Sequence, residues 1–204
     1  VLRHSVLTAL DRIGTVDSAV THASDGKREA RLMALLHLRR EGSAELARFL
    51  SDADPTMRRE AIRAIYDTAA MDTAAGAAVA GYEALKDLPP TVQRRIVAAN
   101  YRLGGSGNAE RLMQLAADAS LDVTLRETAL QALRMWDKRI TADPVLGGHR
   151  AIPKASIAMK ELGGRLGDKL RGFLASQPPA KLAALGLKLA DDLGVSLGAE
   201  TLVA

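Results

Sequence analysis

The sequence predicts an all-α protein, a solenoid of about five to six antiparallel helix pairs stacked one upon the next. Three observations lead to this prediction. Ala and Leu dominate the chain, while aromatic residues make up only 3% of it. Apolar residues recur at helical spacing, and a polar turn followed by an amphipathic helix is repeated along the chain. Because one helix pair cannot bury its apolar side alone, stacking is what allows such a pattern to fold.

The clearest copy of the repeat spans residues 52–69 and reads DADPTMRREAIRAIYDTA. Asp54 and Pro55 are suited to open a helix, since an acidic side chain caps free amides and a proline fits the first turn. Copies begin near residues 2, 27, 57, 92, 125 and 180. Their spacing of about 25 to 35 residues, apart from a last gap of about 55, is typical of helix-pair repeats.

Equivalent positions in these copies predict the core and the role of a recurring arginine. We expect one buried residue per copy at Leu7, Leu35, Ile62, Val97, Leu130 and Leu185. An arginine follows the first apolar residue in three copies, as Arg3, Arg58 and Arg126. We interpret it as a structural contact to carboxylates or helix ends.

Gly and Pro residues divide the chain into the individual helices. In the first part, helices are predicted over 1–13, 16–23, 27–40, 45–51, 57–70 and 72–86. In the second part, they are predicted over 91–103, 109–119, 122–135, 156–175 and 181–193. Gly42 is expected to end one helix and Ser43 to cap the next. The GGSGN stretch at 104–108 is interpreted as a flexible connection.

The helical period fails over residues 136–153, WDKRITADPVLGGHRAIP. Two prolines, two glycines and no apolar stripe predict an ordered loop inserted between the two helices of a pair. Trp136, the only tryptophan, is interpreted as the anchor of this loop. The candidate interaction residues of the loop are Trp136, Asp143, His149 and Arg150.

Composition and motifs argue against several classes of chemistry. The chain has no cysteine, which excludes disulfides, thiolate zinc sites and a cysteine nucleophile. Its four histidines show no metal-ligand spacing, and no Walker, GxGxxG or GxSxG motif is present. We therefore predict no catalytic, cofactor-binding or metal-binding residue, and a non-enzymatic segment. The histidines are His4, His22, His37 and His149.

Charge and hydropathy bear on the partners and on the extent of the chain. The 28 basic and 24 acidic residues are evenly mixed, which counts against a nucleic-acid interface. No apolar run is long enough to span a membrane. The chain opens at Val1 within a helical pattern and stops soon after SLGAETLVA begins one. We therefore expect residues 1–204 to be a single domain and a fragment of a longer protein.

The turn and helix DADPTMRREAIRAI resembles HEAT-like (armadillo-type) repeats, and this resemblance covers most of the chain. The stretch ALQALRMWDKRITADPVLGGHRAIP is similar to the HEAT-like segment of large bacterial dehydrogenase-like, haem-binding proteins. These proteins carry an N-terminal propeller and a C-terminal cytochrome c module. The matching positions are Trp136, Asp143, Pro144, Gly147, His149, Arg150 and Pro153.

That resemblance implies a periplasmic or secreted protein, with a cytoplasmic location left open. Haem attachment requires CxxCH, and this chain has no cysteine, so no haem function is carried onto its residues.

Three functions follow from these observations. The leading one is a non-catalytic scaffold that binds a protein partner or orients flanking domains of the same chain. The alternative is a nucleic-acid-binding HEAT-like protein of the alkylpurine glycosylase type, which the net charge of +4 and Trp136 beside Asp137 favour. The third is a HEAT-like lyase that acts on bilins. The binding face, the oligomeric state and the partner stay open.

Overall fold

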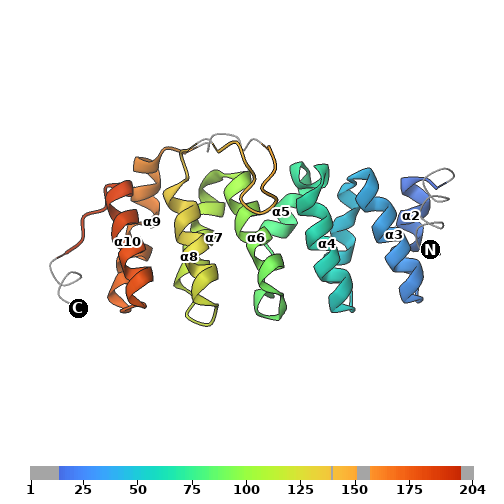
Figure 1. The fold of residues 1–204 in the computed structure, drawn as a ribbon, viewed down its shortest axis with the longest axis horizontal. Helices are drawn as coiled ribbons and strands as arrows, with labels where there is room; N and C mark the ends of the chain where they lie inside the picture. Colours follow the sequence, from blue (N-terminus) through green and yellow to red (C-terminus); the bar gives the residue numbers. More distant parts are fainter. Residues whose placement is uncertain (1–13, 139, 151–156, 199–204) are drawn as a thin grey trace. The chain divides into compact units, whose positions relative to one another are not determined.

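The computed structural model describes residues 14–138, 140–150 and 157–198, and this part of the chain is helical (Figure 1). Two compact units divide the chain: unit 1 ends at Tyr82 and unit 2 begins at Glu83. The all-α class is confirmed, while the continuous solenoid and the single domain stay predictions. The helix expected over 1–13, with Arg3, His4 and Leu7, lies outside the described residues, as does Pro153.

Unit 1 is built around one central helix. Its elements, in which η marks a 3-10 helix, are α2 (Val16–His22), α3 (Arg28–Glu41), η1 (Ala44–Ser51), α4 (Pro55–Asp67), η2 (Ala69–Asp72) and α5 (Ala74–Ala80). Helix α4 packs against α3, η1, η2 and α5. Two predicted helix ends are confirmed: Gly42 ends α3 with a left-handed φ of 60°, and the Ser43 side chain accepts a hydrogen bond from the amide of Glu45.

Unit 2 arranges its helices in two rows. Its elements are η3 (Leu85–Asp87), α6 (Pro90–Leu103), α7 (Gly105–Ala117), α8 (Val123–Arg134), α9 (Met159–Ala175) and α10 (Ala180–Leu193). Helix α8 packs against both α6 and α10, and α7 packs against α9, so alternate helices of the chain are neighbours (Figure 1). Each of the helices α6 to α10 therefore packs against at least two others of the unit.

The predicted core is confirmed at four positions and wrong at one. Leu35, Ile62, Val97 and Leu130 are buried. Leu185 is only partly buried, and α10 instead buries Leu182, Leu189 and Leu193. The cause is Gly186, where an added Cβ would lie 2.9 Å from Leu174 Cδ2. Because α10 approaches α9 through this glycine, its inward face is set by Gly186, and Leu185 lies at the edge.

The GGSGN stretch is not the flexible connection that we predicted. Helix α7 begins at Gly105, immediately after Gly104, and these two residues adopt φ values of 79° and 65°. Glycine takes such angles without the steric penalty that a Cβ brings. Two glycines in succession therefore reverse the chain directly, and the rest of the stretch belongs to α7.

The helices predicted over 57–70 and 72–86 are shorter than expected. Helix α4 stops at Asp67, and α5 covers only Ala74–Ala80. The Thr68 and Thr73 hydroxyls each donate to an upstream carbonyl oxygen, that of Ala64 or Ala70, and each accepts a downstream amide. Threonine side chains compete with the helical backbone in this way, so the chain breaks twice. The segment predicted over 45–51 is present as the 3-10 helix η1.

Candidate functional site

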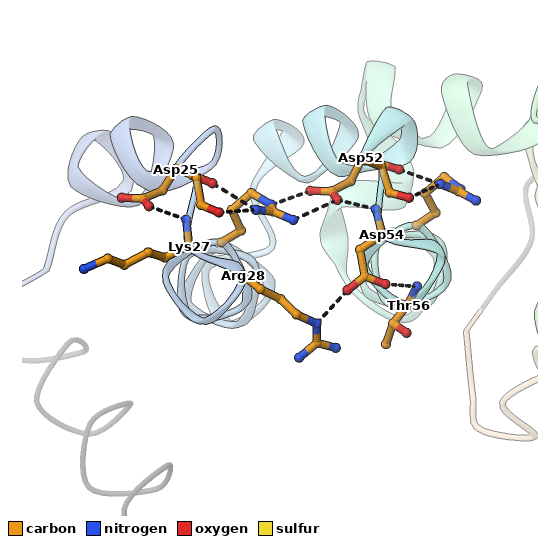
Figure 2. Close-up of polar contacts among 10 residues, drawn as sticks. Asp25, Lys27, Arg28, Asp52, Asp54 and Thr56 are labelled. Atoms are coloured by element: carbon orange, nitrogen blue, oxygen red, sulfur yellow. Dashed lines mark hydrogen bonds and ion pairs between the residues drawn. The ribbon is translucent and has the colours of Figure 1, made fainter.

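The turns of unit 1 contain a chain of ion pairs and hydrogen bonds, here called the Asp–Arg ladder (Figure 2). Its members are Asp25, Lys27, Arg28, Arg31, Asp52, Asp54, Thr56 and Arg58. The Arg31 guanidinium donates to the Asp52 carboxylate, with Nε at 2.8 Å and Nη2 at 3.3 Å. Its Nη1 donates to the backbone oxygen of Asp25 at 2.9 Å. Arg31 thus joins two consecutive turns.

The ladder repeats from one turn to the next. Asp25 accepts a hydrogen bond from the amide of Lys27 at 2.7 Å, and Asp52 accepts one from the amide of Asp54 at 2.8 Å. Arg58 Nη1 donates to the backbone oxygen of Asp52 at 2.6 Å, as Arg31 does to that of Asp25. These contacts place equivalent positions 27 residues apart, the same separation as that of the buried residues Leu35 and Ile62 and within the predicted range of about 25 to 35.

At its two described positions, Arg58 and Arg126, the recurring arginine has the structural role that we predicted, while Arg3 lies outside the described residues. Arg58 contacts the turn before its own helix, as described above, and Arg126 Nε donates to the backbone oxygen of Ala116 at 2.8 Å, in the last turn of α7. Both guanidinium groups donate hydrogen bonds to carbonyl oxygens of the chain itself. We therefore interpret the ladder as a set of contacts that fixes the turns, and not as the binding site.

The ladder makes unit 1 sensitive to acid. The amide of Thr56, and then the Arg28 side chain, donate to the Asp54 carboxylate and hold its pKa below the ordinary value. A carboxylate whose pKa is lowered by folding contributes stability above about pH 4, and this contribution is lost as the pH falls through the folded-state pKa. We expect Asp54→Asn, which still caps α4 but does not titrate, to lose stability less steeply between about pH 5 and pH 2.

Chemical denaturation followed by far-ultraviolet circular dichroism at a series of pH values measures this difference. Parallel pH profiles for the wild type and Asp54→Asn would contradict the assignment.

In unit 2, the loop after α8 is folded around Asp143, which is 1% exposed. Its Oδ1 accepts hydrogen bonds from the amides of Val145 at 2.8 Å and Leu146 at 2.9 Å. The backbone amide of Asp143 donates to the oxygen of Gly148 at 2.9 Å, and Ala142 pairs with His149 in an antiparallel bridge. The carboxylate therefore closes a short turn and holds Leu146 at its tip, 41% exposed.

The structure brings together two of the four predicted loop residues. Arg150 Nη1 lies 3.9 Å from Asp143 Oδ2, so this pair stabilises the turn. His149 is exposed. Trp136 is 1% exposed and contacts the ring of Tyr101 edge-on, with centroids 6.2 Å apart. This burial supports the interpretation of Trp136 as the anchor of the loop.

An apolar groove of about 200 Å³ lies between α6, α8 and this loop. Each helix lines it with residues spaced at i, i+3, i+4 and i+7, which share one helix face. These residues are Arg94, Val97, Ala98 and Tyr101 on α6, and Thr128, Gln131 and Ala132 on α8, with Met135 directly after its last residue. The loop completes the lining with Ile140, Pro144 and Val145. In Figure 1 the described part of the loop, residues 140–150, lies beside α6.

Tyr101 fixes one end of this groove. Its hydroxyl shares its single hydrogen between the backbone oxygens of Met135 at 2.6 Å and Lys138 at 3.2 Å. Burial raises the pKa of this hydroxyl, and the negative charge of Asp137 raises it further. The hydroxyl therefore stays protonated as a donor at neutral pH and ties α6 to the end of α8 and the start of the loop.

Sequence reasoning found the loop but missed the groove. The spacing of ordinary core residues is also that of Val97, Ala98 and Ala132. Arg94 has the spacing of a side chain on the solvent-facing side of a helix. The available signal was a pair of aromatic residues, Tyr101 and Trp136, placed one at the end of each helix in a chain poor in aromatics.

In the residues that the structure describes, no three His, Asp or Glu side chains are grouped so that they could hold a metal ion. Among the helices of the same residues, none is both long and apolar enough to cross a bilayer. No protein-family model matches the chain, and a search of curated proteins finds no match either.

Proposed function

We propose that this chain is a non-catalytic helical-repeat module of the HEAT-like kind that binds a segment of a protein partner in the groove between α6 and α8. The observation that carries the proposal is the combination of this groove with the adjacent loop tip. The buried Asp143 carboxylate holds Leu146 in an exposed position next to Val145, which lines the groove. Binding residues often lie on loops that a rigid scaffold positions, and Leu146 extends the apolar surface of the adjacent groove.

The size and lining of the groove favour a side chain over a free small molecule. Pockets for drug-sized ligands enclose about 300 to 1,000 Å³, whereas this groove encloses about 200 Å³. Its walls are mainly aliphatic, with the Gln131 and Thr128 side chains among them. An apolar anchor from a peptide, surrounded by polar groups that exclude water, is the usual arrangement of a binding hot spot.

The nucleic-acid alternative is less well supported. Trp136 beside Asp137 had favoured it, because an exposed aromatic ring can stack on a base. At 1% exposure, Trp136 has no free face for stacking. The expectation that the module belongs to a larger exported redox protein rests on the resemblance of the loop sequence alone.

The groove is tested with a random peptide library displayed on phage and selected against the whole 204-residue chain. Selected peptides are then synthesised and titrated while the emission of Trp136, which contacts the groove residue Tyr101, is recorded. We expect Ala132→Phe, which fills the groove, to weaken binding by about tenfold or more. Val145→Asp, which places a charge in the same apolar lining, is expected to weaken it as well.

Ala184→Phe is the matched control, because Ala184 is exposed on α10 and does not line the groove. It should bind as the wild type does. Equal binding to the wild type, Ala132→Phe and Val145→Asp would contradict the proposed site, as would a selection that enriches no peptide.

A further inference from the structure

The groove has one charged side chain in its lining, and that charge is positive. Arg94 lies on α6 and is exposed, and neither an aspartate nor a glutamate is among the lining residues. Some other cations of unit 2 do face carboxylates of the same unit, as Arg134 does at 2.7 Å from Asp192 and Lys169 at 2.7 Å from Glu110. Arg94, by contrast, forms no ion pair with any residue in the described ranges.

The position of Arg94 separates it from the anchored end of the groove. On α6, Arg94 is the first of the four residues that line the groove and Tyr101 is the last, seven residues or about 10 Å further along the helix axis. Tyr101 is 6% exposed and contacts the end of α8 and the start of the loop, whereas Arg94 is exposed, so the open end of the lining is at Arg94. Three residues of extended chain, or two turns of helix, span the same distance.

On the basis of the proposed function, we infer that the partner segment carries an apolar anchor and an acidic side chain, and that Arg94 receives the carboxylate. The anchor fills the end near Tyr101 and Met135, where the walls are apolar. The carboxylate lies at the open end, within reach of the Arg94 guanidinium. Gln131, exposed on α8, offers an amide to the backbone of the same segment. A planar guanidinium suits this role because it can bind a carboxylate through two parallel hydrogen bonds.

The inference predicts the composition of the peptides that the library yields. Peptides that bind the wild type but not Ala132→Phe should carry Asp or Glu at a fixed distance from a large apolar residue. Each is synthesised in two forms, one with the acidic residue and one with the corresponding amide. At low ionic strength, we expect Arg94→Gln to weaken binding of the acidic form by about three- to fivefold and to leave binding of the amide form unchanged.

Lys188→Gln removes the same charge from an exposed position on α10, away from the groove, and is the control for the net positive charge of the chain. It should not distinguish the two forms. The difference in affinity for the acidic form between the wild type and Arg94→Gln should also become smaller as salt is added, because salt screens charges that are exposed to solvent.

The outcomes separate this inference from the proposed function. If Ala132→Phe abolishes binding but the acidic and amide forms bind the wild type equally, the groove is the site and the inference about Arg94 is overturned. Selected peptides that lack acidic residues overturn it too. If Ala132→Phe has no effect, the proposed function itself fails.

Discussion

Leu130→Ala is expected to lower the free energy of unfolding of unit 2 by about 2 to 5 kcal/mol. Leu130 lies on α8, the helix that packs against α6, α7 and α10, and its side chain has no exposed surface. Truncation removes buried methyl groups and leaves a cavity whose walls belong to several helices. Because these helices are held by their other contacts, the cavity cannot close completely, and the loss includes the missing dispersion contacts.

Leu187→Ala is the matched control for this change. It makes the same substitution on α10 at a side chain that is 40% exposed. An exposed leucine has little transfer free energy to lose, so its effect should stay below about 0.5 kcal/mol. Urea denaturation followed by the emission of Trp136 reports on unit 2, which contains both positions and the single tryptophan. A change below about 0.5 kcal/mol for Leu130→Ala would refute its role in the core.

Local sequence signals predicted the helices wherever one signal acted without a competitor. The Asp54 carboxylate accepts the amide of Thr56 at 2.7 Å, and α4 begins at Pro55, directly after the cap that Asp54 was predicted to form. Asp122 caps α8 in the same way through the amide of Thr124 at 2.8 Å, although that helix was predicted to begin at Asp122 itself. The predictions failed where a second interaction competed. The hydroxyls of Thr68 and Thr73 accept and donate hydrogen bonds that shorten the helices predicted over 57–70 and 72–86. In the sequence, the two threonines do not stand out from the alanine-rich segment around them.

Register between helices was less predictable than the helices themselves. Apolar periodicity alone tolerates a shift of three residues, because i and i+3 lie on the same helix face. The contacts of Arg31 and Arg58 with the turns before their helices fix the spacing at 27 in unit 1, and these contacts involve carbonyl oxygens that carry no sequence signal. Leu185 was wrongly predicted to be buried for a related reason. The close approach of α10 to α9 at Gly186 decides which face of α10 is buried.

The candidate site was predictable only in part for the same physical reason. Arg150 stood out because it lies beside His149 in the loop where the helical period fails, and Asp143 because it belongs to the resemblance of that loop to HEAT-like segments. The structure pairs the two residues. The groove depends on the distance between the facing sides of α6 and α8, and a sequence pattern does not contain that distance. A groove-lining alanine such as Ala132 and a core alanine such as Ala129 have the same spacing, and only packing distinguishes them.

Gly163→Ala is expected to destabilise unit 2 by about 1 to 3 kcal/mol, although it adds a single methyl group. Helix α9 meets the end of α10 at this glycine, and a Cβ built there would lie 2.3 Å from the backbone oxygen of Leu193. A flexible side chain could turn away, but a backbone carbonyl cannot. Leu193 is the last residue of α10, and Gly194 follows it in a left-handed conformation with φ 65°, so the whole helix end must move to make room.

The adjacent Gly164 provides the control within the same helix. A Cβ at Gly164 meets no atom within 4 Å, and the position is exposed. Because alanine restricts the unfolded chain and favours a helix over glycine, Gly164→Ala should stabilise the unit by about 0.5 to 1 kcal/mol. The two substitutions are chemically identical and differ only in what the new methyl group meets. Opposite shifts of the urea midpoint are therefore expected, and a stabilised Gly163→Ala would contradict the close packing of α9 on α10.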